Sequence, residues 1–367
     1  MTGTDPTDIL LFGTGAFAAR IAFDLAATAK APVRVMIAGR NGRRLDWLRT
    51  AANARAAVFE TGARFCSREV DLLQPGTPET VIGSVRPTVV VQAASVQTSA
   101  VIAASGDAWG QLVAEGGLSA TAVFQAVLSA RVARAIRDVH PAAKMINCCF
   151  PDVVNGILAA MKLPVLCGVG NVAILSSAFG GVLAMEGATR PPLQVLAHYQ
   201  LLGSWRQLQA TRHGPAPRVW ISGTEVADVY SRFGSVLLTP EPAIEISGAT
   251  GVPLMLAIAA AQAWSGHVPG PDGLPGGYPV QWRNGHLSLD LPSGLARADA
   301  IAWNGAFEAK NGLTVDGTWV RYSGRLASLL HDVSPSIAAG FDVSDLDEVV
   351  ATLEAIRTRL LNQPATR

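Results

Sequence analysis

Over its first 150 residues the chain alternates between short apolar runs and longer amphipathic segments. The apolar run DILLF (8–12) ends at Gly13, and an Ala-rich amphipathic segment follows at 16–29. The same order repeats, which predicts strands at 33–38, 64–71, 88–94 and 144–148 and helices at 43–54, 77–85 and 119–139. Strands alternating with helices are typical of a parallel sheet with helices on both faces. The pattern predicts an α/β fold with an N-terminal, doubly wound parallel sheet.

The pattern changes after about residue 190, where strand-like runs are separated by Gly and Pro. We expect strands at 193–203 and 217–223, a long buried helix at 247–264, a Pro/Gly-rich loop at 267–280, a hairpin at 281–292 that turns at Asn284–Gly285, and a capped helix at 343–363. These elements predict a second, α+β domain. We place the division between an N-terminal domain, 1–165, and a C-terminal domain for substrate binding and dimerisation, 166–367.

A glycine motif lies between the first expected strand and the first expected helix. Gly13, Thr14, Gly15, Ala16, Phe17 and Ala18 fit the pattern G-x-G-x-x-A. The first glycine permits a tight turn, the second lets the backbone approach a pyrophosphate, and the small last residue lets helix and strand pack closely. A glycine turn with no nucleotide is the alternative, but the strand–helix–strand context favours a dinucleotide-binding Rossmann domain.

The end of the second expected strand bears on the choice of cofactor. NAD enzymes usually have an acidic residue there, which binds the ribose 2′-hydroxyl. This chain has Gly39, Arg40 and Asn41, and no acidic residue until Asp46. Because a guanidinium binds a phosphate through two charge-assisted hydrogen bonds, Arg40 predicts NADP(H). A solvent-exposed basic helix start is the alternative.

Further residues are assigned to the same cofactor site. Arg43 or Arg44 would assist Arg40 at the 2′-phosphate. The residues that follow the fourth expected strand would also line the site: Ala93, Ala94 and Ser95. We therefore expect a glycine turn, a basic strand end and a small-residue strand end to converge on NADPH.

Residues 88–175 resemble the lactate/malate dehydrogenase-like superfamily. The resemblance rests on TVVVQAAS, a small-residue loop, a long helix, KMINCCFPDVVNGIL and LPVLCGVGNVAIL. INCCFPD followed by LCGVGN is also similar to the related NAD-dependent family 4 glycosidases. The long helix, the Pro/Gly-rich loop, the hairpin and the C-terminal helix resemble the final third of the same superfamily. The resemblance implies a dehydrogenase or reductase.

The resemblance implies two catalytic residues. Asn147 matches an asparagine that contacts substrate and nicotinamide ribose, and its alternative is a strand-end turn residue. His198 lies near the place of the catalytic histidine, where it would donate a proton as hydride arrives. A core histidine is the alternative there. His213 is held in reserve, whereas His267 and His286 are assigned to a loop and a hairpin.

The chain departs from the superfamily where a substrate carboxylate would bind. The dehydrogenases carry an arginine on the loop after the fourth strand, but residues 95–117 contain none. They carry another soon after the Gly-x-Gly turn, but residues 171–181 are uncharged. A desolvated carboxylate needs such a partner. We therefore expect a C=O or C=N bond in a small, largely neutral substrate.

Other features are read as structural. The family 4 glycosidases bind a metal through Cys and His, yet Cys148, Cys149 and Cys167 are expected to act as small buried apolar residues, so no metal is predicted. Two weaker candidates are a polar pocket and a lid over the nicotinamide. The pocket would use Glu225, Asp228, Tyr230 and Arg232, and the lid would be 95–117 with Trp109.

The composition limits the classes of partner that this chain is expected to bind. The 367 residues are 49% hydrophobic and 16% charged, and the net charge is +1. The sequence has no basic block, which argues against nucleic acid as a partner. It also has no apolar run long enough to indicate a membrane-spanning helix. Four cysteines without paired spacing indicate a reducing compartment. We expect a cytoplasmic homo-oligomer, a homodimer, that acts on a small molecule.

The leading hypothesis from the sequence is an NADP-dependent oxidoreductase. An opine- or saccharopine-type dehydrogenase acting on amino-acid imines is a second one, and it predicts that Arg206 or Arg212 faces the nicotinamide. A non-catalytic NADP-binding sensor is the third.

Overall fold

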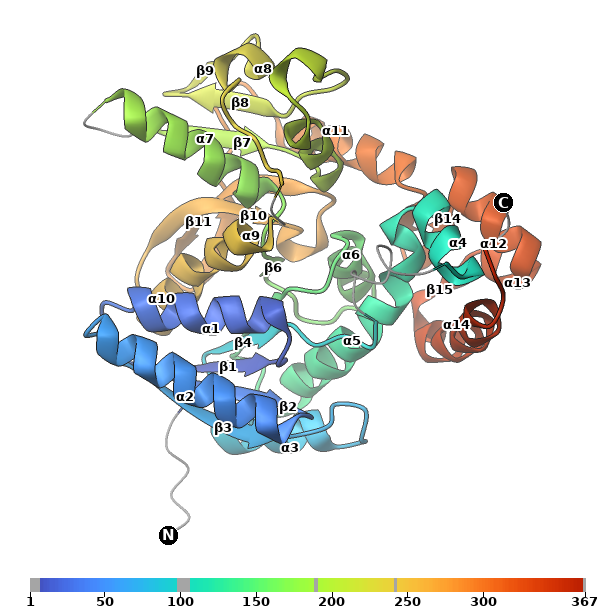
Figure 1. Cartoon of the computed structure of the whole chain (residues 1–367), viewed down its shortest axis with the longest axis horizontal. Coiled ribbons are helices and arrows are strands. Elements are labelled where there is room, and N and C mark those ends of the chain that lie inside the picture. Colours follow the sequence, from blue (N-terminus) through green and yellow to red (C-terminus); the bar gives the residue numbers. More distant parts are fainter. Residues whose placement is uncertain (1–6, 98–105, 188–190, 241–242, 366–367) are drawn as a thin grey trace.

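The computed structural model describes residues 7–97, 106–187, 191–240 and 243–365. Six parallel strands form one sheet in the order β3-β2-β1-β4-β5-β6. The strands are β1 (Ile9–Phe12), β2 (Val33–Gly39), β3 (Ala63–Glu69), β4 (Val89–Gln92), β5 (Lys144–Asn147) and β6 (Cys167–Gly168). The doubly wound parallel sheet predicted from the apolar runs is confirmed. It lies in the lower left of Figure 1.

Both faces of this sheet are buried because successive strand residues point to opposite faces. Ile9 and Leu11 pack into one cluster with α1 (Ala16–Thr28) and α2 (Gly42–Val58). Leu10 and Phe12 pack into another with α3 (Thr77–Val85) and α5 (Ala122–Val139). This explains why the strands read as continuous apolar runs rather than as alternating ones.

The second half adds two three-stranded antiparallel sheets and several helices above the parallel sheet (Figure 1). The elements are α6 (Val153–Ala160), α7 (Val172–Glu186), β7 (Leu193–Leu196), β8 (Arg218–Ile221), β9 (Thr224–Glu225), α8 (Val229–Arg232), β10 (Trp264–Pro269), β11 (Gly277–Arg283), β12 (His286–Leu289) and α11 (Arg297–Lys310). The hairpin predicted at Asn284–Gly285 is confirmed, since Arg283 pairs with His286.

Two expectations for the second half are wrong. The predicted helix 247–264 is two short helices, α9 (Ile244–Thr250) and α10 (Val252–Ala259), and β10 begins at Trp264. Pro lies in the first turn of α10, where it cannot donate the hydrogen bond that would continue α9. The predicted loop 267–280 contributes residues to β10 and β11 instead, which pair with each other.

The strand predicted at 193–203 is also too long. It ends at Leu196, and a 3₁₀ helix spans Tyr199–Arg206. The His198 side chain accepts a hydrogen bond from the backbone N–H of Gln200, which caps that helix and ends the extended run. The apolar residues after Leu196, which suggested a longer strand, therefore lie in a helical segment.

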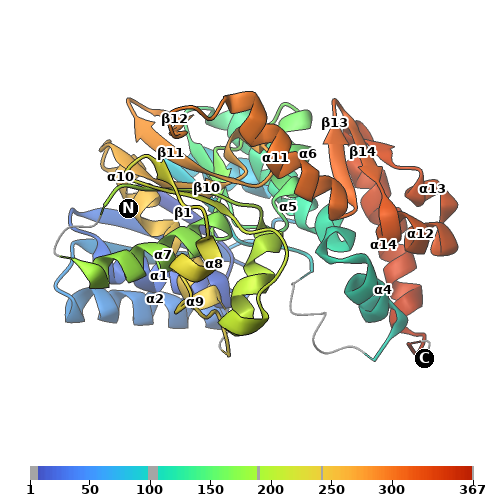
Figure 2. The same ribbon diagram turned by 90° about the horizontal axis from the view of Figure 1, so that it is seen from above.

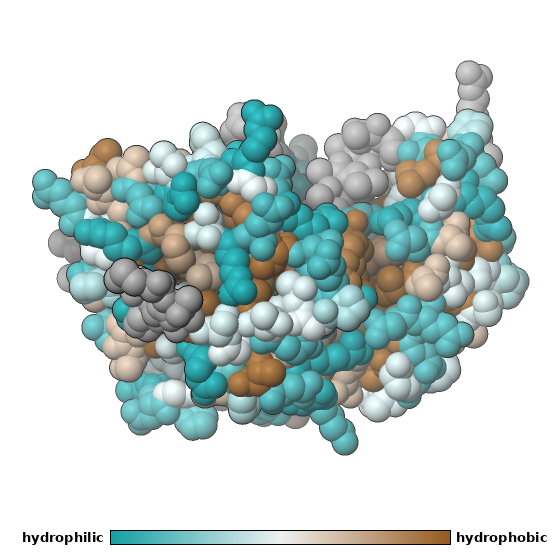
Figure 3. Space-filling model, turned by 90° about the horizontal axis from the view of Figure 1, so that it is seen from below, coloured by the Kyte–Doolittle hydropathy of each residue, from teal (hydrophilic) through white to brown (hydrophobic). Residues whose placement is uncertain are grey.

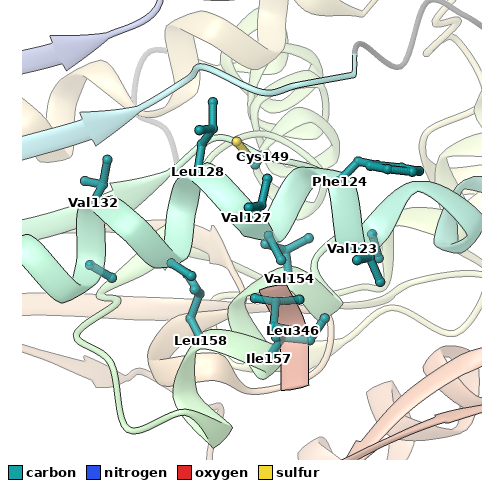
Figure 4. Close-up of a cluster of buried hydrophobic side chains, with 14 of the residues drawn as sticks. Val123, Phe124, Val127, Leu128, Val132, Cys149, Val154, Ile157, Leu158 and Leu346 are labelled. Carbon is teal, nitrogen blue, oxygen red and sulfur yellow. The ribbon is translucent and has the colours of Figure 1, made fainter. Parts of the chain in front are cut away.

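The C-terminal segment forms a module that packs on the N-terminal half. It contains β13 (Leu313–Asp316), β14 (Trp319–Tyr322), α12 (Gly324–Val333), α13 (Pro335–Ala338), β15 (Phe341–Asp342) and α14 (Leu346–Leu361). Figure 2 shows the module beside α4 (Ala108–Gly116) and away from the parallel sheet. Leu346 joins Val127 and Ile157 in one buried cluster (Figure 4). The division at residue 165 stays a prediction.

The predicted lid segment is only partly described, since residues 98–105 lie outside the described ranges. Its second part is α4, in which Trp109 is fully buried, with its ring 5.9 Å from that of Phe124. Trp109 is therefore a core residue. The expectation that it covers the nicotinamide is wrong, because the apolar face of α4 packs inward.

The surface is mixed. Figure 3 shows hydrophilic residues over most of the face seen from below, with hydrophobic residues concentrated toward its hollowed middle. None of the helices within the described ranges is long and apolar enough to cross a membrane.

Candidate functional site

A cavity of 680 Å³ opens where β1, β2 and β4 end. It brings together most of the residues predicted to bind the cofactor: Gly13, Thr14, Gly15, Gly39, Arg40, Asn41, Ala93, Ala94 and Ser95. The crevice outside the carboxyl ends of the strands is where open α/β sheets bind ligands. The three segments chosen from the sequence therefore meet at the expected edge.

The glycine turn fits a pyrophosphate. Gly13 has a φ of +129°, and a Cβ there would lie 3.0 Å from the Ala93 carbonyl, so only glycine fits. At Gly15 a Cβ would meet nothing within 4 Å, which leaves open space before α1. No side chain caps α1. The first N–H groups of the helix thus lack helical partners, and they and the helix dipole favour an anion.

Ala16, Phe17 and Ala18 are not among the residues that line the cavity. They form the first turn of α1, and Ala18 is buried against the sheet. Their expected part in cofactor binding is through backbone N–H groups and close packing.

The basic residues after β2 have different positions. Arg40 is exposed and lines the cavity, as does Arg43. Arg44 does not line it: its Nε donates to the Thr14 carbonyl oxygen at 3.2 Å, and its guanidinium lies 4.6 Å from the Trp47 ring. Asn41 caps α2 by accepting from the Arg44 N–H at 2.9 Å. Arg44 thus braces the glycine turn, Asn41 caps α2, and Arg40 and Arg43 are the guanidinium groups that line the cavity.

Sequence reasoning missed several lining residues. Four of them follow β3, and the others come from the end of β2, the start of α2, the segment after β4 and the middle of α5. In chain order they are Ala38, Gly42, Val70, Asp71, Leu72, Leu73, Val96 and Leu128. The end of the third strand was the available signal, because it lies at the same edge of a parallel sheet as the ends of its neighbours.

His198 lies in the second half and is fully buried. Its Nε2 is 2.5 Å from Oε2 of Glu308 on α11, and its Nδ1 accepts from the Gln200 N–H at 3.3 Å. The second contact places the proton of the neutral ring on Nε2, where it points at the carboxylate. The Tyr199 ring packs at 4.5 Å from the imidazole. Sequence reasoning did not find Glu308, which lies 110 positions along the chain.

Asp152 belongs to the same buried group. Its pKa is raised to about 7, mainly by burial; the His198 charge lowers it, the Glu308 charge raises it, and the hydrogen bond from Asn171 lowers it. One carboxylate oxygen accepts from Asn171 Nδ2, and the other, Oδ2, is buried without a hydrogen-bond partner among the described residues. The loop after β5 therefore places beside His198 a carboxyl group whose pKa is near neutrality.

Asn147 ends β5 and is buried. Its Oδ1 accepts from Ser129 Oγ at 3.0 Å and from the Cys149 N–H at 3.2 Å, and its Nδ2 donates to Asn155 at 2.8 Å. These contacts hold the turn that leads to Asp152. An amide has two N–H groups, so one of them has no hydrogen bond among the described residues.

Cys148, Cys149 and Cys167 pack in the apolar clusters (Figure 4 shows Cys149), whereas Cys66 is exposed. Burial raises the pKa of Cys149 to about 11 and raises those of Cys148 and Cys167 well above the ordinary range. A thiol that stays protonated is a poor metal ligand or nucleophile. Within the described ranges no three His, Cys, Asp or Glu side chains are arranged to hold a metal.

The weaker candidates lie apart from the cavity. Glu225 pairs with Arg218 and Glu186 with Arg232, both on the exposed surface. Arg212 donates to the carbonyl oxygens of Gly234 and Val236.

His213 and His267 each contact the backbone through a ring nitrogen. His213 is exposed and bonds the Thr211 carbonyl. His267 lies in β10, not in a loop as expected, and its Nε2 accepts from the Val195 N–H at 2.9 Å. Burial lowers its pKa to about 3.

The His198–Glu308 pair has a measurable consequence. Glu308→Gln keeps an acceptor for Nε2–H but removes its charge, so we expect the free energy of unfolding to fall by about 1–2 kcal/mol. Urea unfolding at pH 7 measures this. Glu225→Gln, which breaks an exposed pair, should cost less than about 0.5 kcal/mol and serves as the control. Equal losses in the two variants would contradict a buried, charge-assisted contact.

The fold is that of the lactate and malate dehydrogenases. The malate dehydrogenase of Picrophilus torridus matches with a TM-score of 0.52 and 12% identity over 84% of this chain and 96% of its own. The lactate dehydrogenase of Eimeria maxima, solved with NADH and oxamate, matches with a TM-score of 0.50 and 12% identity. The match covers 97% of this chain and 99% of that enzyme. The malate dehydrogenase of Aeropyrum pernix matches with a TM-score of 0.51 and 13% identity, over 90% of this chain and 99% of its own. No protein-family model and no curated protein matches this sequence.

Proposed function

We propose that this protein is an NADP-dependent oxidoreductase that transfers hydride to a C=O or C=N bond of a small substrate without a carboxylate. The observation that carries the proposal is the 680 Å³ cavity, where an uncapped helix start, the open space at Gly15 and the exposed Arg40 meet. Neighbours with this fold include an enzyme solved with NADH, which supports a nicotinamide dinucleotide. Arg40 without an acid on β2 supports the phosphorylated form.

Each part of the cavity would hold one part of the cofactor. The turn from Gly13 to Gly15 and the first turn of α1 would bind the pyrophosphate, and Arg40 with Arg43 the 2′-phosphate. The small residues after β4 leave room for the nicotinamide ribose. When bound, the nicotinamide supplies the hydride, and the chain supplies position and a proton.

His198 is the proposed proton donor. Its Nε2 carries the proton toward Glu308, so a substrate oxygen or nitrogen would have to replace that carboxylate as the acceptor. Transfer from the neutral ring would leave an imidazolate, so the ring would first take up a second proton on Nδ1 in place of the Gln200 hydrogen bond. Glu308 would stabilise that imidazolium until the substrate replaces it, and the Nε2 proton would then pass to the substrate and leave a neutral ring. The unused N–H of Asn147 is the proposed contact to substrate or ribose.

The charges around His198 support a neutral or cationic substrate. Asp152 and Glu308 are two buried carboxyl groups beside it, and a 2-keto acid would bring a third. Like charges in a poorly solvated site repel strongly. A ketone, an aldehyde or a protonated imine meets no such barrier, which keeps imine reduction as the second candidate.

A turnover screen tests the proposal. NADPH oxidation is followed by the loss of the reduced nicotinamide's absorbance with neutral ketones, aldehydes, cyclic imines and, for comparison, 2-keto acids. We expect turnover with a neutral carbonyl or imine and none with the keto acids. Tight NADPH binding without turnover in any class would favour a sensor, and no dinucleotide binding would overturn the whole proposal. The proposal includes a cytoplasmic homodimer, and light scattering of the purified protein measures its mass.

A further inference from the structure

Glu69 places an acidic group beside the cofactor cavity, at the end of β3. It is the last residue of β3, and in the parallel pairing of β2 with β3 it lies opposite Gly39. The next residue, Val70, donates its N–H to the Gly39 carbonyl at 2.9 Å, which fixes the two strand ends side by side. The end of β2, which carries no acid of its own, therefore has the carboxylate of its neighbour beside it.

The carboxylate of Glu69 lies against the start of α2. A Cβ built on Gly42, the first residue of that helix, would be 2.7 Å from Glu69 Oε2. Asn41 satisfies the N–H of Arg44, while the N–H groups of Gly42 and Arg43 have no partner within the helix. A negative group at a helix start is favourable, so the carboxylate occupies a position that suits an anion.

This position lies between two cavities. The cofactor cavity and a neighbouring one of 740 Å³ share Arg40, Val70 and Asp71. Glu69 and Arg68 line the neighbouring cavity, whereas Gly42 and Arg43 line the cofactor cavity. Arg40 and Glu69 are both exposed, and no ion pair joins them among the described residues. Each is thus available to a ligand that reaches the start of α2.

We infer that Glu69 is a specificity-determining residue for the cofactor, acting against Arg40. The inference rests on the proposed dinucleotide site. The carboxylate accepts hydrogen bonds from the ribose hydroxyls of NAD(H) and repels the 2′-phosphate of NADP(H), while Arg40 attracts that phosphate. The two side chains oppose each other, so the site binds both dinucleotides with a modest preference for NADP(H).

The test compares Glu69→Gln with the wild-type protein by dinucleotide fluorescence titration. At low salt we expect NADPH to bind about fivefold more tightly and NADH about threefold more weakly, since one partly screened charge is removed. Glu60→Gln makes the same change at the other end of α2, at an exposed residue, and should alter neither affinity. In Arg40→Gln/Glu69→Gln the two dinucleotides should bind within about twofold of each other.

The outcomes separate the two proposals. If wild-type protein binds NADPH or NADH and Glu69→Gln leaves the ratio of affinities unchanged, the role of Glu69 is overturned and the dinucleotide site stands. Weaker NADPH binding in Glu69→Gln overturns it as well. If the wild-type protein binds neither dinucleotide, the proposed function fails first.

Discussion

Arg40→Asp is expected to lower the affinity for NADPH relative to NADH by about a hundredfold. The variant removes a bidentate, charge-assisted contact to the 2′-phosphate and adds a second carboxylate beside Glu69, which together amount to about 2–3 kcal/mol. Arg40 is exposed and has no hydrogen-bond or ion-pair partner among the described residues, so the fold should be unaffected. Fluorescence titration of both dinucleotides measures the ratio.

Arg49→Asp is the matched control for this variant. Arg49 lies on α2, the helix that follows Arg40; its side chain pairs with Asp46 on the exposed surface and does not line the cavity. We expect its ratio of affinities to stay within about twofold of the wild-type ratio, because solvent screens a charge beyond about 10 Å. An unchanged preference in Arg40→Asp would contradict the phosphate contact and leave the glycine turn as the sole basis for dinucleotide binding.

Asp152→Asn is expected to stabilise the protein at neutral pH and to flatten its dependence on pH. Burial raises the pKa of Asp152 from 3.8 to about 7 in the folded state. The folded protein therefore holds this proton more tightly than the unfolded chain does. The resulting stability is fully present below about pH 4 and is lost as the pH rises to about 7, by about 4 kcal/mol in all. Asparagine has no charge to bury.

Urea unfolding at pH 5, 6, 7 and 8 measures this effect. The gain of Asp152→Asn over the wild-type protein should grow with each step up to pH 7 and then level off. Asp316→Asn, at the exposed end of β13, should shift stability equally at every pH. A gain that is the same at all four values would show that Asp152 is not desolvated. An acid held in the folded state at such a cost is typical of a functional site.

The N-terminal half was predictable because its signals are local. The parallel sheet followed from apolar runs such as 8–12 and from their alternation with helices, since burial on both faces demands apolar residues throughout. Arg40 was found because a strand end next to a glycine turn has a known place in this architecture. The helices α9 and α10 were joined in error because their common apolar character outweighed one proline.

The site around His198 shows why local signals were insufficient. His198 was selected because the superfamily resemblance implies a catalytic histidine near that position, but Glu308, which holds its Nε2, comes from α11 and lies far along the chain. Asp152 had no distinctive motif, and only its burial beside those two groups gives it a pKa near neutrality. Desolvation is a property of the assembled core, so no pattern in the chain reports it.

The sequence by itself determined the α/β class, the glycine turn and the basic end of β2, because hydrophobic periodicity and turn chemistry act between residues close in the chain. Only the tertiary structure decided that Trp109 is a core residue and that Glu308 faces His198. It also decided that Glu69 stands beside Gly42, where the register of β2 with β3 brings an acid to a strand end that lacks one. Pairing between strands and packing between helices join residues that local patterns leave independent.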